Sequence, residues 1–158
     1  MSTSFWLDHG LWGLFAVSFL AGSVVPLPSE AALIGAIAIG HAPVTAAVVA
    51  TVGNLLGAVT IFAMTRALAG PDGERVGRFL ERKTSADRAR VERAMAKVRR
   101  WGAPALLLSW VPIVGDPLVA AAGLARVGWG PFFAFVTVGK AARYAMIAAA
   151  ASAVVGER

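Results

Sequence analysis

The sequence contains no cysteine among its 158 residues. This absence excludes disulfides and thiolate catalysis, and it removes the commonest ligands of structural zinc and iron–sulfur sites. Charged residues are also scarce, at 15% of the chain against about a quarter in an average soluble protein. Hydrophobic residues make up 58%, and they gather in long runs such as residues 44 to 65. The composition therefore predicts an integral membrane protein.

The net charge of +6 comes largely from one segment. Ten of the fifteen basic residues lie between Arg75 and Arg100, and five acids between positions 72 and 92 compensate part of this charge. The distribution does not favour nucleic-acid binding. Short loops rich in Lys and Arg stay in the cytoplasm. We therefore expect a multi-pass inner-membrane protein, with this basic loop cytoplasmic and both termini extracytoplasmic.

The first half of the chain consists of two short apolar arms followed by a longer apolar segment. Residues 11 to 25 and 31 to 39 are apolar, and Pro26 and Pro28 break the backbone between them. At 1.5 Å per residue the arms reach only about 22 Å and about 14 Å, less than a hydrocarbon core of about 30 Å. They are therefore expected to form a re-entrant hairpin, whereas residues 44 to 69 are long enough to cross. Alternatively, the first arm counted from Phe5 has about 21 residues, which is enough to span if Asp8 and His9 tolerate the interface.

The second half repeats this plan. Residues 103 to 111 and 118 to 125 form the two apolar arms, and residues 132 to 155 form the closing span. The break between the arms is marked by Pro112, Gly115 and Pro117.

The two halves also match residue by residue. Ser23, Pro26 and Glu30 correspond to Ser109, Pro112 and Asp116 at an offset of 86 residues, and the Thr-Val-Gly at 51 to 53 recurs at 137 to 139. This agreement indicates duplication, although Ala- and Gly-rich membrane segments also align easily. One crossing per half would invert the second half.

The predicted fold is an all-α polytopic membrane protein, an inverted repeat with two re-entrant helical hairpins and two or more full transmembrane helices. One membrane domain, residues 1–158, would comprise repeat one (about 11–69), a cytoplasmic basic amphipathic segment (about 70–102) and repeat two (about 103–155).

Two carboxylates, Glu30 and Asp116, lie within apolar sequence. An acid inside a membrane is by default a candidate for proton relay or cation binding. The alternative is helix capping, because Asp116 before Pro117 resembles an N-cap with proline at the first helical position. Ser29 before Glu30 likewise resembles a cap followed by a first-turn acid.

Two cations, Lys140 and Arg143, lie three residues apart inside the closing span. They are candidates for holding a lipid phosphate, because arginine suits bidentate phosphate contact. Asn54, Ser29 and Ser109 are candidates to complete this headgroup site. The alternatives are internal pairing of the two acids with the two bases and, for Asn54, an ordinary interhelical hydrogen bond.

The basic segment has a helical pattern of apolar residues, including Val91, Met95 and Val98. We expect an interfacial helix that either attracts anionic lipid or serves only as a topology anchor. Gly53 and Gly57 form a G-x-x-x-G pattern, which permits close helix approach. We expect no enzyme activity, no cofactor and no metal site.

Several motifs resemble the DedA family, also called SNARE-associated or VTT-domain membrane proteins, and within it the short YqaA-like branch. The resemblance covers nearly the whole chain. The motifs are Pro-Leu-Pro-Ser-Glu at 26 to 30, Gly-Asn-Leu-Leu-Gly at 53 to 57, the second hairpin at 108 to 116, Gly-Trp-Gly-Pro-Phe at 128 to 132, and Gly-Lys-Ala-Ala-Arg-Tyr at 139 to 144.

The resemblance implies a two-hairpin fold and transport of a phosphate-bearing lipid, undecaprenyl phosphate or a phospholipid, with proton coupling as a further proposal. Its partners would be membrane lipids and protons or cations. Larger family members carry arginines where this chain has Ser109 and Gly115, so Lys140 and Arg143 would substitute for them. A proton- or cation-coupled exporter of small solutes and a non-transporting scaffold for membrane assembly are the alternative functions.

Overall fold

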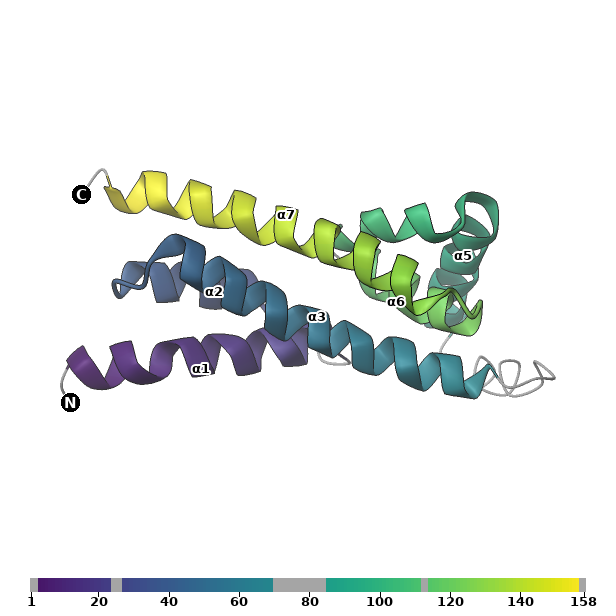
Figure 1. The fold of residues 1–158 in the computed structure, drawn as a ribbon, viewed down its shortest axis with the longest axis horizontal. Helices are drawn as coiled ribbons and strands as arrows, with labels where there is room; N and C mark the ends of the chain where they lie inside the picture. Colours follow the sequence, from purple (N-terminus) through teal and green to yellow (C-terminus); the bar gives the residue numbers. More distant parts are fainter. Residues whose placement is uncertain (1–2, 24–26, 70–84, 112–113, 157–158) are drawn as a thin grey trace. The chain divides into compact units, whose positions relative to one another are not determined.

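The computed structural model describes residues 3–23, 27–69, 85–111 and 114–156, and all regular secondary structure in these ranges is helical (Figure 1). In chain order the elements are α1 (Thr3–Gly22), α2 (Ser29–Ala38), α3 (Pro43–Leu68), α5 (Ser85–Trp101), the 3₁₀ helix η1 (Ala103–Trp110), α6 (Gly115–Leu124) and α7 (Trp129–Gly156). The prediction of an all-helical chain is confirmed for these residues.

Two helices, α3 and α7, are long and apolar enough to cross a membrane. The 26 residues of α3 extend about 39 Å at 1.5 Å per residue, which exceeds a hydrocarbon core of about 30 Å. Both lie where the sequence predicted the closing spans. The re-entrant character of the segments before them stays a prediction.

The first arm of each half differs from its expected form. α1 begins at Thr3, eight residues before the expected arm, and its 20 residues extend about 30 Å. In the second half, residues 103 to 110 form a 3₁₀ helix that follows Gly102, whose φ of +65° suits glycine. Eight residues is long for a 3₁₀ helix, because its hydrogen-bond geometry is poorer than that of an α-helix.

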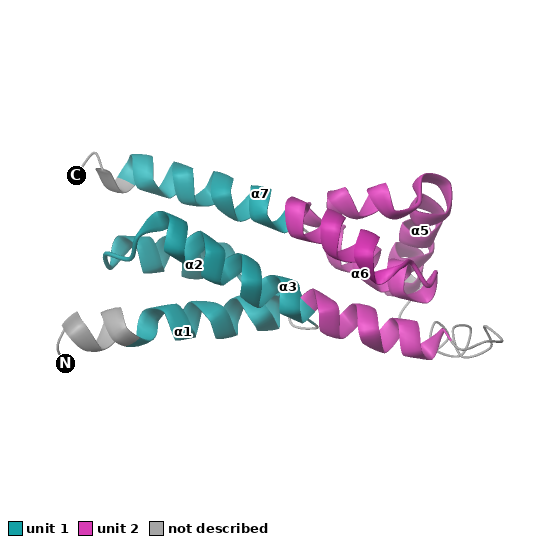
Figure 2. Ribbon diagram, in the orientation of Figure 1, with its two compact units in different colours: residues 1–57, 140–158 teal, residues 58–139 magenta. Residues whose placement is uncertain are grey.

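The chain divides into two compact units, which Figure 2 colours separately. Unit 1 comprises residues 1–57 and 140–158, and unit 2 comprises residues 58–139. The buried core of unit 1 draws on α1, α2, α3 and α7, and its members are Leu14, Leu33, Ala36, Ile37, Ala46, Ala50, Tyr144, Ala148 and Ala151.

Within unit 1, α1 and α3 approach each other closely through glycine. A Cβ atom added at Gly53 would lie 2.7 Å from the Phe15 carbonyl oxygen, and one at Gly57 would lie 2.7 Å from the Gly22 carbonyl carbon. These contacts are backbone contacts, so no side chain can move aside. The expected role of the G-x-x-x-G pattern in close helix approach is confirmed.

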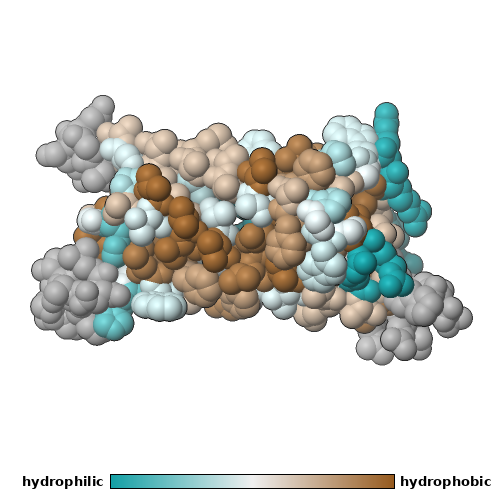
Figure 3. Space-filling model, viewed as in Figure 1, coloured by the Kyte–Doolittle hydropathy of each residue, from teal (hydrophilic) through white to brown (hydrophobic). Residues whose placement is uncertain are grey.

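In unit 2, α5 packs against α6 and η1. Its buried residues are Ala94 and Val98, with Val91 and Met95 half-buried beside them. The expected amphipathic helix is therefore present, but protein covers part of the apolar face that an interfacial helix would place in lipid. Along α3 and α7 the visible face of the molecule is mostly apolar, whereas hydrophilic side chains gather beside α5 (Figure 3).

The end of α3 and the start of α7 meet in an aromatic cluster of unit 2. Phe62 stacks on Phe132 with ring centroids 4.0 Å apart and meets Trp129 edge-on at 4.8 Å. Arg66 lies over the Phe62 ring and donates a 2.5 Å hydrogen bond to the carbonyl oxygen of Val127, just past the end of α6. Arg66 thus joins the end of α3 to the turn before α7.

The local backbone repeats at an offset of 86 residues. α6 begins and ends 86 residues after α2 begins and ends, and α7 begins 86 residues after α3 begins. Each short helix ends in the same motif: the amides of Gly40 and His41 donate to Ile37 and Ala36 at the end of α2. The corresponding bonds from residues 126 and 127 to residues 123 and 122 end α6.

This motif is the Schellman motif, which needs a residue of positive φ after the helix. That residue is Gly40, with φ of 108°, in the first half and Arg126, with φ of 55°, in the second.

Candidate functional site

The start of α2 and the middle of α7 form a polar cluster inside unit 1. Glu30, in the first turn of α2, makes an ion pair with Arg143 of α7. Beside it, the hydroxyl groups of Ser29 and Tyr144 form a buried hydrogen bond of 2.8 Å. Arg143 and Tyr144 are neighbours on α7, as Ser29 and Glu30 are on α2, so two contacts join the two helices.

A second polar contact joins α3 to α7. The ammonium group of Lys140 donates a hydrogen bond to the side-chain oxygen of Asn54, and both residues are buried, with 4% and 6% exposure. The amide nitrogen of Asn54 donates in turn to the carbonyl oxygen of Ser18 at 3.2 Å. The contact thus extends from α7 through α3 to α1.

Small residues make this chain of contacts possible. A Cβ at Gly22 would collide with the backbone of Asn54, and Gly53 lies against Ser18 and the backbone of α1. α1 can therefore come close enough for Asn54 to reach a main-chain oxygen. A larger residue at either glycine would move α1 away from that hydrogen bond.

The ion pair is accessible, whereas the contacts beside it are not. The side chains of Arg143 and Glu30 are 22% and 33% exposed, but Ser29 and Tyr144 are 3% and 1% exposed. A guanidinium group has five N–H donors, and a single carboxylate accepts hydrogen bonds from only some of them. A phosphate could therefore contact Arg143 while the buried hydroxyl pair keeps α2 and α7 in place.

Ser29 and Asp116 were expected to be N-cap residues, and this prediction is wrong for both. α2 begins at Ser29, its N-cap is Pro28, and no side chain caps it within the described residues. The hydroxyl of Ser29 instead contacts Tyr144. In the second half α6 begins at Gly115 with Val114 as N-cap, again without a side-chain cap in the described part of the chain. Glu30 and Asp116 are thus first-turn acids, which favour the positive end of the helix dipole without capping it.

The residues expected to mark the breaks of the two hairpins lie at different positions relative to the helix that follows. Pro28 directly precedes α2, whereas Gly115 and Pro117 lie in the first turn of α6. Proline is tolerated there because first-turn amides have no partner inside the helix. Pro26 and Pro112 lie outside the described residues.

The two remaining candidates, Asp116 and Ser109, belong to unit 2. Asp116 is exposed at the start of α6. Ser109 is 3% exposed, and its hydroxyl oxygen has no hydrogen-bond partner within the described residues. The other candidates, Glu30, Ser29, Asn54, Lys140 and Arg143, belong to unit 1, so a shared site of Glu30 and Asp116 stays a prediction.

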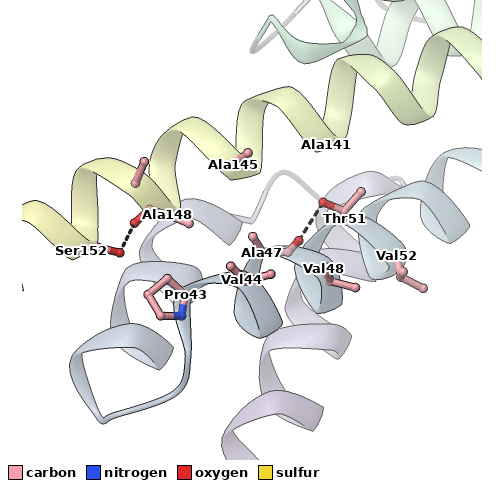
Figure 4. A pocket seen from close by; sticks show the side chains of 11 residues that line it. Pro43, Val44, Ala47, Val48, Thr51, Val52, Ala141, Ala145, Ala148 and Ser152 are labelled. Carbon is pink, nitrogen blue, oxygen red and sulfur yellow. Dashed lines mark hydrogen bonds between the residues drawn. The ribbon is translucent and has the colours of Figure 1, made fainter.

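An apolar groove of about 470 Å³ lies between α3 and α7 in unit 1 (Figure 4). It is lined by Pro43, Val44, Ala47, Val48, Thr51 and Val52 of α3 and by Ala141, Ala145, Ala148, Ala149 and Ser152 of α7. At 3.6 residues per turn, Arg143 lies about 200° around α7 from Ala141. The groove therefore belongs to the other face of α7 and is too apolar to hold a phosphate.

Sequence reasoning missed two residues that take part in these contacts, Tyr144 and Ser18. Tyr144 is the only tyrosine of the chain and follows Lys140 by four residues, which places both toward one helical face. That spacing could have identified it. Ser18 contributes through its main-chain oxygen, which no residue-type signal reveals.

Comparison with known proteins identifies the family. The model of the VTT domain matches residues 27–153, a range that begins just before α2, includes all of α3 and ends within α7. The chain belongs to the VTT domain (DedA) family. The sequence resemblance to this family is thereby confirmed.

Three curated relatives are similar over most of the chain. The inner membrane protein YqaA of Escherichia coli (strain K12) is 40% identical over 142 residues, which cover 89% of each chain. YqaA of Shigella flexneri gives the same values. An uncharacterized protein of Haemophilus influenzae is 32% identical over 151 residues, covering 90% of this chain and 88% of the relative. No solved structure gives a significant match.

Proposed function

We propose that this VTT-domain protein is an inner-membrane transporter that moves a phosphate-bearing lipid, undecaprenyl phosphate or a phospholipid, across the bilayer. The observation that carries the proposal is the accessible ion pair between Glu30 and Arg143, which lies between α2 and a helix long enough to span. Ionisable groups in such helices are costly and are usually functional. The proposed location is supported by the two apolar helices and by the two relatives named as inner membrane proteins.

The ion pair suggests how binding is coupled to protons. A proton on Glu30 removes its negative charge and releases the guanidinium group of Arg143. The guanidinium group then donates hydrogen bonds to the phosphate, its new anionic partner. Loss of the proton restores the pair and expels the phosphate. The exchange requires Arg143 to be reachable, and its exposure of 22% agrees with this.

The neighbouring contacts are assigned positioning and headgroup roles. Lys140 adds a second cation near Arg143, and Asn54 holds its ammonium group. Ser29 and Tyr144 fix α2 against α7, so that Glu30 meets Arg143 in one geometry. In the second half, Asp116 is proposed as the second proton-relay acid and Ser109 as a headgroup contact.

The inverted-repeat architecture is part of this proposal. The coincidence of α2 with α6 at an offset of 86 residues supports a duplication, as does the recurrence of the Schellman motif. Asn54 and Lys140 are equivalent at this offset and contact each other. Two re-entrant hairpins, a cytoplasmic basic loop and extracytoplasmic termini would complete the arrangement.

A lipid-translocation assay in proteoliposomes tests the function. Labelled phospholipids and a polyprenyl phosphate are compared for the wild type, Arg143→Ala and the matched surface variant Arg90→Ala. We expect Arg143→Ala to lower the rate about 10- to 100-fold, because a hydrogen bond to a charged group contributes about 1.5–3 kcal/mol. Arg90→Ala should leave the rate unchanged.

The same assay separates the alternative functions. Proton movement without movement of any lipid would indicate an exporter of small solutes. A folded wild-type protein that moves neither lipids nor protons would indicate a scaffold. The topology is tested separately by a C-terminal alkaline-phosphatase fusion, which should be active if the C-terminus is extracytoplasmic.

A further inference from the structure

The second half of α5 presents a stripe of cations on the face opposite its packed face. Arg93, Lys97 and Arg100 follow one another at spacings of four and three residues, so they align along one side of the helix. All three are exposed, whereas Ala94 and Val98 are 5% and 4% exposed. The packing of α5 in unit 2 thus fixes the direction in which the stripe faces.

The acids of α5 do not neutralise this stripe. Glu92 pairs with Arg88 at 3.2 Å, and Asp87 pairs with Arg90 at 3.7 Å, both in the first half of the helix. Among the described residues, no carboxylate forms an ion pair with Arg93, Lys97 or Arg100. The charge that remains is therefore concentrated toward the C-terminal end of the helix.

The sequence after α5 continues directly into an uncharged, apolar segment. Trp101 is the last residue of α5 and is 57% exposed, and η1 begins two residues later. η1 has no charged residue and exposes Leu107 and Trp110. Tryptophan favours the headgroup level of a bilayer, where its ring can lie in lipid and its N–H in water.

We infer that Arg93, Lys97, Arg100 and Trp101 form a docking surface for the anionic headgroups of the adjacent lipid leaflet. The charge of the stripe selects anionic over zwitterionic headgroups, and Trp101 sets the depth of the helix. The helix dipole alone does not account for the stripe, because Arg93 lies two turns before the end of α5 and dipole effects fade within the last turn. This surface is distinct from the ion pair of unit 1 and does not depend on the proposed transport.

Lipid retention tests the inference on the full-length protein. The protein is reconstituted in nanodiscs of equal parts phosphatidylglycerol and phosphatidylcholine, extracted gently, and examined by native mass spectrometry for the lipids it keeps. In the triple variant Arg93→Gln/Lys97→Gln/Arg100→Gln we expect the ratio of retained phosphatidylglycerol to phosphatidylcholine to fall at least about threefold. The wild-type preference should also weaken as salt is raised, because exposed charges are screened.

The matched control is Arg88→Gln/Glu92→Gln, which removes an ion pair of the same helix without changing its net charge. It should keep the wild-type ratio. The charge-preserving variant Arg93→Lys/Arg100→Lys should keep it as well, and circular dichroism establishes that each variant is folded. An unchanged ratio in the triple variant, or an equal fall in the control, would overturn the inference. An unchanged preference in Arg143→Ala would separate this surface from the transport site.

Discussion

Replacement of Gly53 by alanine tests whether the close approach of α1 and α3 maintains the hydrogen bonds that Asn54 makes with Ser18 and Lys140. The added methyl carbon would lie 2.7 Å from the Phe15 carbonyl oxygen and 3.2 Å from the Phe19 amide nitrogen. Even the close C–H···O contacts between packed helices have C···O distances of about 3.3–3.6 Å. The two helices must therefore separate by roughly 0.5 Å or more, a distance estimated from the same contact range.

The expected cost follows from three contributions. Overpacking of this kind costs about 1–3 kcal/mol. Loss of the hydrogen bond from Asn54 to Ser18 adds about 1 kcal/mol. The better helix propensity of alanine offsets about 1 kcal/mol. We therefore expect Gly53→Ala to lower the free energy of unfolding by about 1–3 kcal/mol, and transport to fall because Asn54 no longer holds Lys140 in place.

The control is Gly35→Ala in α2, where an added Cβ meets nothing within 4 Å. This change should raise the free energy of unfolding by up to about 1 kcal/mol, because only the propensity gain remains. Both variants are compared by denaturant titration in detergent, followed by circular dichroism. The opposite signs make the comparison decisive: if Gly53→Ala is as stable as Gly35→Ala, the glycine contact does not constrain the two helices.

Three further predictions concern single groups. Tyr144→Phe and Ser29→Ala should each lower the free energy of unfolding by about 1 kcal/mol, because each removes the same buried hydrogen bond, and the double variant should cost less than the sum. Arg126→Gly should raise the free energy of unfolding by about 1 kcal/mol in the same titration, since glycine adopts the positive φ already present at Gly40 without strain. Glu30→Gln should remain folded but lose transport driven by a proton gradient; transport at the wild-type rate from pH 6 to 8 would exclude Glu30 as a proton relay.

The apolar segments could be predicted from the sequence because hydrophobic length is a strong and local signal. The starts of α3 and α7 were anticipated to within a few residues. The start of α1, at Thr3, lies close to the alternative that counted the first arm from Phe5. The polar residues Asp8 and His9 kept the sequence from deciding between that start and residue 11. The backbone type of η1 was missed, since no residue pattern separates a 3₁₀ from an α-helix in an apolar run.

The sequence predicted several residues that contact one another in unit 1, but it did not predict most of their partners. Internal pairing of charges was one of the two alternatives for Arg143, and its contact with Glu30 confirms that alternative for this pair. The partner of Ser29 could not be predicted, because Tyr144 is 115 residues away and only tertiary packing brings them together. The cap at Ser29 was wrong for the same reason, since the distant hydroxyl took the place of the local amide as its partner.

Asn54 and Lys140, which contact each other, occupy equivalent positions at the offset of 86 residues but differ in residue type. Equivalent residues of a duplicated chain meet each other only near the axis that relates the copies, so this contact would mark that axis in the proposed arrangement. Two lysines there would repel each other at close range, and two asparagines would provide no cation for a phosphate. One lysine held by one asparagine supplies a single buried charge together with its hydrogen-bond acceptor. In the proposed arrangement, unlike residues at this pair would therefore serve a shared site better than identical ones, whereas the neighbouring Thr-Val-Gly is identical in both halves.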